Sequence, residues 1–259
     1  MARMTTPEER EFIATTGPQM RDLALLSDRL PVLNAGYVRL LDHMGDDLAP
    51  VNDARASFRK ELPAMRPADL RLLAFLGEAD PIHYEPFAHS KIKFEVCAPI
   101  MVANEWYRTA VDSCYLSEGH AWSEASWRYL SQDLAFYIPE RWRAAAANRK
   151  QGSAGPLSED YQEDAAADLD RTIRNGVTTY QLWIGLGMAP EQARGFLPYA
   201  FLYTTFRWTA SLYTVARWLR LREGSGALWE IRQYADAVHE LTRVLFPNAI
   251  AALVPEVQR

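Results

Sequence analysis

SEASWRY, residues 123–129, closes the stretch from Glu105 to Tyr129 around which the rest of the chain is organised. Within it Glu124, Ser126 and Arg128 are spaced by two, so in an extended segment their side chains project from the same side of the chain. A guanidinium can form two parallel hydrogen bonds to phosphate oxygens, and a hydroxyl can donate one more. These three side chains could therefore bind a phosphate or a sugar. The same pattern is also typical of a solvated strand edge, because these residue types are common on surfaces.

The composition is that of an ordinary globular protein. The 259 residues, 49% hydrophobic and 24% charged, suffice for one large domain or two small ones with a substantial core. A net charge of −5 argues against a protein that coats nucleic acid. The two cysteines, Cys97 and Cys114, are too few for a disulfide framework. We expect a cytoplasmic protein without membrane contact, because no apolar run reaches about 18 residues and Met1–Asp28 lacks a signal-peptide core.

The first half of the chain carries the strand patterns. Val38–Asp42 and Lys91–Val96 alternate, and the second is predicted to keep its polar residues outward. Helical spacing marks Pro50–Lys60 and Pro67–Leu76, and Pro99 fits the first turn of a further helix. Val102 and Trp106 would form the buried side of that helix.

The second half of the chain is predicted to be helical. Residues 151–156 are predicted to form a flexible connector. The helical segments after it are Ser158–Ile184, Ala189–Arg194, Tyr203–Leu221 and Leu228–Leu245. These patterns favour an α+β fold with a small sheet early in the chain. We expect an N-terminal arm over residues 1–35 and a single domain over residues 36–259.

Several motifs accompany SEASWRY in a fixed order. They are PFAH at 86–89, KIKFEVCAPI at 91–100, VANEWYR at 102–108 and FYIP at 136–139. Together they resemble the flavin-dependent thymidylate synthases, which carry the pattern PF.H…KAPI.VARQW.RHR…S.NE.S.RY…FYIP. Further similar segments are GYVRLLDHMGDD at 36–47, LR at 221–222, WEI at 229–231 and QYA at 233–235. Several motifs in one order are more specific than any one alone. The resemblance implies a small twisted sheet flanked by long helices.

The resemblance implies residues for a nucleotide substrate. By position they are Glu105, Glu124, Ala125, Ser126, Arg128, Arg194 and Arg222. Arg222 would be the catalytic residue, because a permanent cation beside the uracil ring stabilises negative charge that develops on its carbonyls. Arg207 and Arg220, on the same predicted helix, are expected to reach solvent.

The resemblance also implies FAD as cofactor, NADPH as reductant and 5,10-methylenetetrahydrofolate as carbon donor. The positions that match flavin-contacting residues of the family are Ser57, His83, Glu85, Arg108, Arg217 and Leu221. The chain has neither G-x-G-x-x-G nor a P-loop, so no Rossmann turn would hold the flavin. No metal is expected, because no histidine pair has the spacing of metal ligands. A homotetramer with its sites between subunits is implied as well.

The family pattern breaks in one place above all. Its Arg-His-Arg hallmark reads Arg108-Thr109-Ala110 here, and we infer an insertion of about seven residues between Thr109 and His120. Glu105 replaces a glutamine that lies beside the nucleotide. Ser123 replaces an asparagine of the family pattern, and Tyr213 replaces an arginine. Ser211, Arg217 and Gly226 replace residues that line the flavin in the family.

These departures leave several functions open. The leading one is C5-methylation of UMP, in which the longer segment would accommodate the ribose 2′-hydroxyl, as in related methylases of nucleoside-antibiotic pathways. The second is a thymidylate synthase that acts on dUMP with a divergent loop. The third is a nucleotide- and flavin-binding homologue without catalysis. A purely structural helical assembly would explain the aromatic helices but not the ordered motifs.

Overall fold

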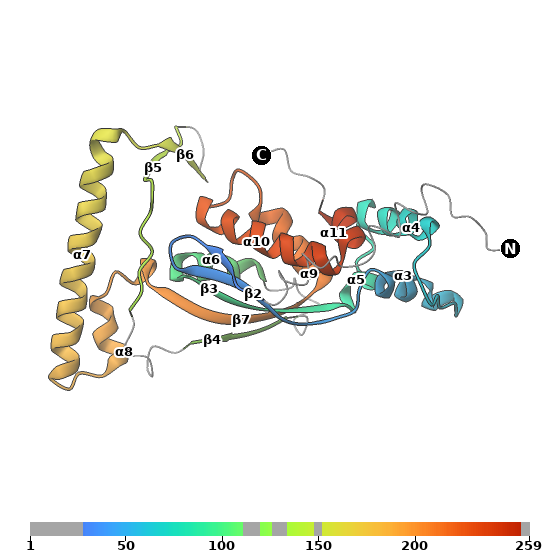
Figure 1. The fold of residues 1–259 in the computed structure, drawn as a ribbon, viewed down its shortest axis with the longest axis horizontal. Coiled ribbons are helices and arrows are strands. Elements are labelled where there is room, and N and C mark those ends of the chain that lie inside the picture. Colours follow the sequence, from blue (N-terminus) through green and yellow to red (C-terminus); the bar gives the residue numbers. More distant parts are fainter. Residues whose placement is uncertain (1–27, 111–119, 126–133, 148–151, 255–259) are drawn as a thin grey trace.

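The computed structural model describes residues 28–110, 120–125, 134–147 and 152–254. Its centre is a five-stranded antiparallel sheet of order β1-β2-β3-β7-β4. The strands are β1 (Leu30–Val32), β2 (Gly36–Met44), β3 (Lys91–Pro99), β7 (Tyr203–Ser211) and β4 (His120–Glu124). Helices pack around this sheet, so the α+β fold class is confirmed (Figure 1).

The predicted helix Tyr203–Leu221 is wrong over its first half. Residues Tyr203–Ser211 form β7, which pairs with β3 on one side and with β4 on the other. Both rows of its backbone groups are thereby satisfied, and its aromatic and β-branched residues suit a pleated, buried surface. Helix α9 (Leu212–Arg222) follows, and the Ser211 side chain caps it by accepting from the Thr214 N–H at 3.1 Å. Arg207 therefore lies on a strand and not on a helix.

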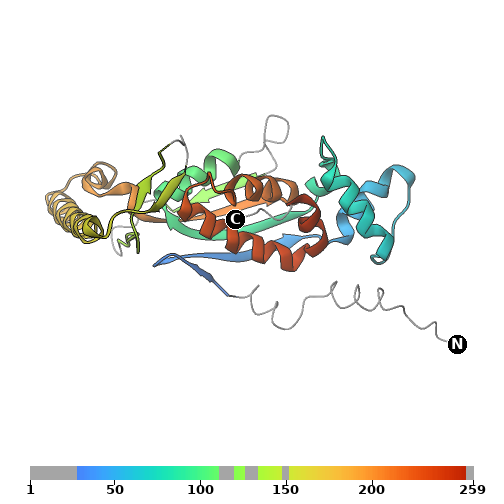
Figure 2. The same cartoon turned by 90° about the horizontal axis from the view of Figure 1, so that it is seen from above.

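Helices α6 (Ile100–Ala110), α9 and α10 (Trp229–Leu245) bury the apolar face of the sheet (Figures 1 and 2). Trp106 of α6 is fully buried, as predicted, and its ring centroid lies 4.1 Å from that of Trp218 and 5.5 Å from that of Trp208. Val102 is buried as well, which confirms the expected orientation of this helix. The helix begins at Ile100, because Pro99 still belongs to β3.

Glu95 on β3 departs from the predicted polar-outward pattern. It is only 7% exposed, although it lies on the polar side of the strand. Arg39 of β2 and Arg207 of β7 stand opposite it in register and pair with its carboxylate at 2.7 and 3.3 Å. Burial alone would raise its pKa, but the Tyr37 hydrogen bond and the two arginines lower it overall. Three neighbouring strands are thus tied together by one carboxylate.

Two groups of helices extend the ends of the sheet. At one end are α3 (Leu48–Arg55), the 3-10 turn η1 (Ala56–Phe58), α4 (Pro67–Glu78), α5 (Glu85–Ala88) and α11 (Pro247–Leu253). At the other end are α7 (Glu159–Gly185), α8 (Pro190–Ala193), η3 (Arg194–Phe196) and η4 (Tyr199–Phe201) (Figure 1). The predicted helices over Pro67–Leu76, Ser158–Ile184 and Leu228–Leu245 are confirmed. The helix predicted to reach Lys60 ends at Arg55, and α11 was not predicted.

Two expected irregular segments contain strands. Ser153–Pro156, within the predicted connector, forms β6 and pairs with β5 (Arg143–Ala145). Leu30–Val32, within the expected N-terminal arm, pairs with β2 as the edge strand of the sheet, and residues 1–27 lie outside the described part. Among the described residues, none of the helices combines the length and the apolar content that a membrane span requires.

Candidate active site around the end of helix α9

A large cavity, here named the α9 cavity, lies beside α9. Its volume is about 1080 Å³, and its walls come from α9, α5, α11 and the segment that joins α4 to α5. Four predicted flavin residues line it together: His83, Glu85, Arg217 and Leu221. These residues are far apart in the sequence, so the fold brings them to one place.

Aromatic rings line or support the walls of the α9 cavity. The His83 ring stacks on Phe75 with centroids 5.6 Å apart, and Tyr84 lies 5.3 Å from Tyr213 of α9. Arg217 and Arg220 add cationic side chains to the same cavity. Flat rings and guanidinium groups are the partners that a ring-bearing phosphate ligand uses.

Arg222 faces a second, smaller cavity next to α10, here named the α10 cavity, of about 470 Å³. Its guanidinium is held by α6. Nη2 donates to the Glu105 carbonyl at 2.6 Å, and Nη1 pairs with the Glu105 carboxylate at 3.3 Å. Burial lowers the Arg222 pKa and the Glu105 charge raises it, but an arginine titrates far above neutral pH, so the cation is permanent. Glu105 and Arg222 thus form one wall of the α10 cavity.

Thr109 connects α6 to α9 at the point where the Arg-His-Arg pattern breaks. Its hydroxyl oxygen accepts from Arg222 Nε at 3.1 Å, and its carbonyl accepts from Arg217 at 3.5 Å. Leu221 lines the α9 cavity, whereas the next residue, Arg222, lines the α10 cavity. The end of α9 therefore lies between the two cavities, and Thr109 contacts an arginine from each.

The sequence matches known proteins along most of its length. The family described as "Thymidylate synthase complementing protein" matches residues 39–248. A flavin-dependent thymidylate synthase of Thermus thermophilus is 38% identical over 223 residues, which cover 86% of this chain and 77% of that protein. The Thermosipho africanus enzyme of the same name is 36% identical over 204 residues, covering 79% and 84%.

The chain belongs to the flavin-dependent thymidylate synthase family. It is therefore an FAD-dependent enzyme of the methyltransferase type. Among solved structures, the UMP/dUMP methylase PolB from Streptomyces cacaoi bound with 5-Br dUMP matches with a TM-score of 0.72 at 25% identity, covering 86% of this chain and 96% of that one. The same methylase bound with 5-Br UMP gives a TM-score of 0.71 at 23% identity, covering 87% and 96%.

The α9 cavity fits the FAD that membership in this family implies. Its volume of about 1080 Å³ lies at the upper limit of the roughly 300–1,000 Å³ of common ligand pockets, which suits a large cofactor. Its arginines suit the pyrophosphate and its rings suit a flat heterocycle. Ser57 and Arg108 do not line this cavity: Ser57 lies exposed in η1, and the largely exposed Arg108 side chain pairs with Glu105 at 3.4 Å.

Three of the predicted nucleotide-binding residues lie away from these cavities. Arg194 is in η3 beside α7, with its guanidinium 5.8 Å from the Tyr199 ring. Glu124 ends β4 and accepts from the Thr204 hydroxyl at 2.9 Å, and the Ala125 N–H donates to β7. None of these three lines the α9 or the α10 cavity. Ser126 and Arg128 lie outside the described residues.

One group of buried polar residues was not predicted from the sequence. The Tyr137 hydroxyl donates to Glu230 Oε1 at 3.0 Å, and Arg143 pairs with the same oxygen. Burial and the neighbouring carboxylate both raise the Tyr137 pKa, so this phenol stays protonated. Glu230 Oε2 is buried without a hydrogen-bond partner among the described residues. The FYIP and WEI motifs were a signal for this group, because both support the family resemblance without an assigned role.

Proposed function

We propose that this enzyme methylates C5 of the uracil ring of UMP in preference to dUMP, with 5,10-methylenetetrahydrofolate as carbon donor and NADPH as reductant. The observation that carries the proposal is the permanent cation of Arg222. Contacts with Glu105 and Thr109 fix it at the wall of the α10 cavity, beside the cavity that fits FAD. Transfer to C5 builds negative charge on the uracil carbonyls, and a fixed cation stabilises this charge without reorganisation.

The remaining nucleotide contacts follow from the family pattern. Arg128, Arg194 and Ser126 would anchor the phosphate, with Glu124 and Ala125 beside them. Glu105 would contact the nucleotide while it orients Arg222. No protein nucleophile is required, so these residues position the substrate and stabilise charge.

The α9 cavity would hold FAD through His83, Glu85, Arg217 and Leu221, whereas Ser57 and Arg108, which do not line it, would contact the flavin outside this cavity. Bound FAD supplies the redox chemistry of the transfer to C5. The chain itself binds and orients the reacting groups and keeps the cationic Arg222 in place.

The preference for UMP rests on the segment between Thr109 and His120. We infer that its extra residues make room for the ribose 2′-hydroxyl, and the similarity to the UMP/dUMP methylase PolB supports this. The methylated product would enter nucleoside-antibiotic biosynthesis in the cytoplasm. The alternatives are a dUMP-specific thymidylate synthase and a homologue that binds nucleotide and flavin without catalysis.

The proposal includes a homotetramer with its sites between subunits. Helix α7 supports it: Tyr161, Leu182 and Leu186, on and at the end of this helix, are 60%, 57% and 68% exposed. Exposed apolar side chains of this size on one element are typical of an interface. Arg194, which lines neither cavity of this chain, would reach the site of a neighbouring subunit.

The test is a turnover assay with FAD, NADPH and methylenetetrahydrofolate, in which UMP and dUMP are compared side by side and the product is identified by mass. We expect faster methylation of UMP. Faster methylation of dUMP would make the enzyme an ordinary thymidylate synthase. Absence of product from both nucleotides, with flavin bound, would refute catalysis and favour the binding homologue.

A further inference from the structure

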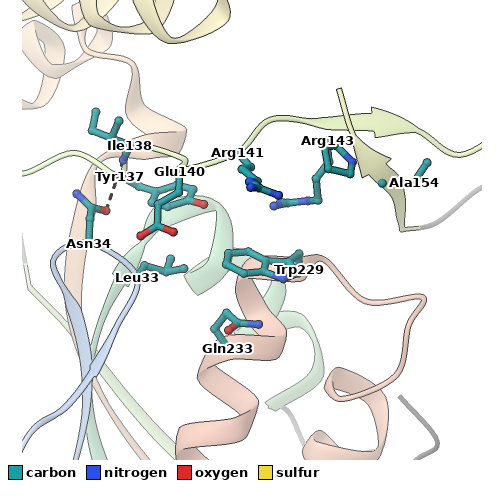
Figure 3. Close-up of a pocket in the computed structure, with 12 residues that line it drawn as sticks. Leu33, Asn34, Tyr137, Ile138, Glu140, Arg141, Arg143, Ala154, Trp229 and Gln233 are labelled. Atoms are coloured by element: carbon teal, nitrogen blue, oxygen red, sulfur yellow. Dashed lines mark hydrogen bonds between the residues drawn. The ribbon is translucent and has the colours of Figure 1, made fainter. Parts of the chain in front are cut away.

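A third cavity adjoins the α10 cavity and contains none of the predicted site residues. It measures about 500 Å³, within the roughly 300–1,000 Å³ of small-molecule sites, and is named here the Trp229 cavity (Figure 3). Its walls come from the β1–β2 turn, residues 137–143, β6 and the first turns of α10. Residues of both FYIP and WEI, to which no role was assigned from the sequence, line it: Tyr137, Ile138 and Trp229.

The Arg143 guanidinium is engaged by contacts within the wall of the cavity. Its guanidinium pairs with Glu230, its Nε donates to the Ser153 hydroxyl at 3.1 Å, and it lies 4.9 Å from the centroid of the Trp229 ring. These contacts tie β5, β6 and α10 together. Arg143 is therefore preorganised, and so is the Trp229 ring beside it.

Arg141 is placed differently. It is exposed and lines the cavity, and within the described part of the chain no hydrogen bond or ion pair engages it. In Figure 3 the guanidinium groups of Arg141 and Arg143 point toward one another on the Trp229 side of the cavity. Two converging guanidiniums repel each other unless an anion lies between them, and guanidinium forks match carboxylate and phosphate oxygens.

The far side of the cavity carries an acidic side chain instead of cations. Glu140 and Asn34 line it there, and Figure 3 shows Glu140 pointing away from the arginines, toward Leu33. An anion would be repelled from that side and drawn to Arg141. Trp229 and Gln233 form the adjoining wall, so a ring with polar edges can pack against an indole and an amide.

The two cavities share part of their walls. Tyr137, Arg141 and Arg143 line both the Trp229 cavity and the α10 cavity, which contains Arg222. Arg141 thus lies between the two cavities, so a ligand anchored at it in the Trp229 cavity lies next to the cavity that contains Arg222. This arrangement suits a reactant that is long, anionic at one end and reactive at the other.

We propose that the Trp229 cavity binds the anionic end of a ring-bearing co-substrate, with Arg141 as its main cation and Trp229 as its apolar support. This inference rests on the proposed function, whose two co-substrates share this chemistry: NADPH carries phosphates, and the folate carries carboxylates. The uracil nucleotide is not the ligand of this cavity.

The test measures equilibrium binding of NADPH alone and of tetrahydrofolate alone by calorimetry to the FAD-loaded full-length protein. Arg141→Gln removes the cation, and loss of a charged hydrogen-bonding group should weaken binding of one of the two by about tenfold or more. Glu140→Gln removes an opposite charge from the same cavity and should leave that affinity equal or tighter. Arg171→Gln, on the exposed face of α7, is the distant control and should change nothing.

The outcomes distinguish NADPH from the folate as the ligand, and they test this inference separately from the proposed function. Weaker NADPH binding assigns the site to the dinucleotide, and weaker folate binding assigns it to the carbon donor. Unchanged binding of both in Arg141→Gln overturns the inference, as does equal weakening by Arg141→Gln and Glu140→Gln, or weaker binding of UMP instead. If no nucleotide is methylated yet Arg141→Gln still loses co-substrate affinity, the proposed function fails and this site stands. If methylation proceeds and Arg141→Gln binds both co-substrates normally, the proposed function stands and this site is refuted.

Discussion

Thr109 is the residue whose substitution tests the arrangement around α9 most directly. It replaces the histidine of the family's Arg-His-Arg pattern, and its hydroxyl oxygen accepts from Arg222 Nε at 3.1 Å. Thr109→Val keeps the shape of the side chain and deletes this acceptor, whereas Thr109→Ser keeps the hydroxyl. We expect the valine variant to leave Arg222 less firmly oriented while the core of α6 stays intact.

The structure sets the size of this effect. A hydrogen bond to a charged group contributes about 1.5–3 kcal/mol. Arg222 keeps two contacts with Glu105, at 2.6 and 3.3 Å, so the loss should lie near the low end. About 1.5 kcal/mol corresponds to roughly a tenfold decrease in kcat/KM. Because Arg222 stabilises charge that develops during the reaction, most of the decrease should appear in kcat and little in KM for the nucleotide.

The assay is steady-state methylation at saturating cofactors, with FAD content measured by absorbance for every variant. Thr109→Ser should retain nearly full activity, and all variants should bind FAD like the wild type. The reasoning is refuted if Thr109→Val has a normal kcat. It is also refuted if the serine variant is impaired as much as the valine variant, since the hydroxyl would then be irrelevant.

Three further predictions concern charge, acid stability and assembly. Arg222→Gln should lower kcat about 100-fold, because it removes one preorganised charge-stabilising group. The exposed control Arg243→Gln should leave kcat unchanged. Equal kcat values for the two variants would show that Arg222 has no catalytic role. Asp69 is fully buried and pairs with Arg55 at 2.5 Å and Arg66 at 3.1 Å, so Asp69→Asn should lower the free energy of unfolding by about 3 kcal/mol at pH 7 in denaturant titrations. Burial raises the Asp69 pKa, but the two arginines lower it overall. The stabilisation of the fold by the Asp69 carboxylate is therefore complete above about pH 4 and is lost as the pH falls through the lower folded-state pKa. The asparagine variant should lack this pH dependence. Leu182→Glu, on the exposed side of α7, should produce smaller species in light scattering at unchanged helix content; an unchanged mass would place the interface elsewhere.

Much of the helical framework and part of the site could be predicted from the sequence. Pro67–Glu78, Glu159–Gly185 and Trp229–Leu245 carry apolar residues at helical spacing over several turns, and a long periodic pattern is a strong local signal. The family motifs named His83, Glu85, Arg217 and Leu221, and these four do meet in one cavity. Their meeting could be expected because the motifs describe a fold and not only a local shape.

The errors have a common cause. Tyr203–Ser211 was predicted to be helical because it runs directly into a true helix, and its strand state depends on β3 and β4, more than 70 residues away in sequence. The buried position of Glu95 likewise depends on Arg39 and Arg207, which only the register of three strands places opposite it. The pairing partners and the register of a strand are set by distant segments, so its own segment does not reveal them.

The sequence by itself determined the family, the main helices and the identity of the arginine expected to act on the uracil ring. These follow from local spacing and from the order of motifs, both of which are written along the chain. Only the tertiary structure decided that Thr109 holds Arg222, that Leu221 and Arg222 face different cavities, and that Arg141 stands without a carboxylate partner among the described residues. Contacts, cavities and charge balance depend on which distant side chains the packed sheet and helices bring within a few ångströms.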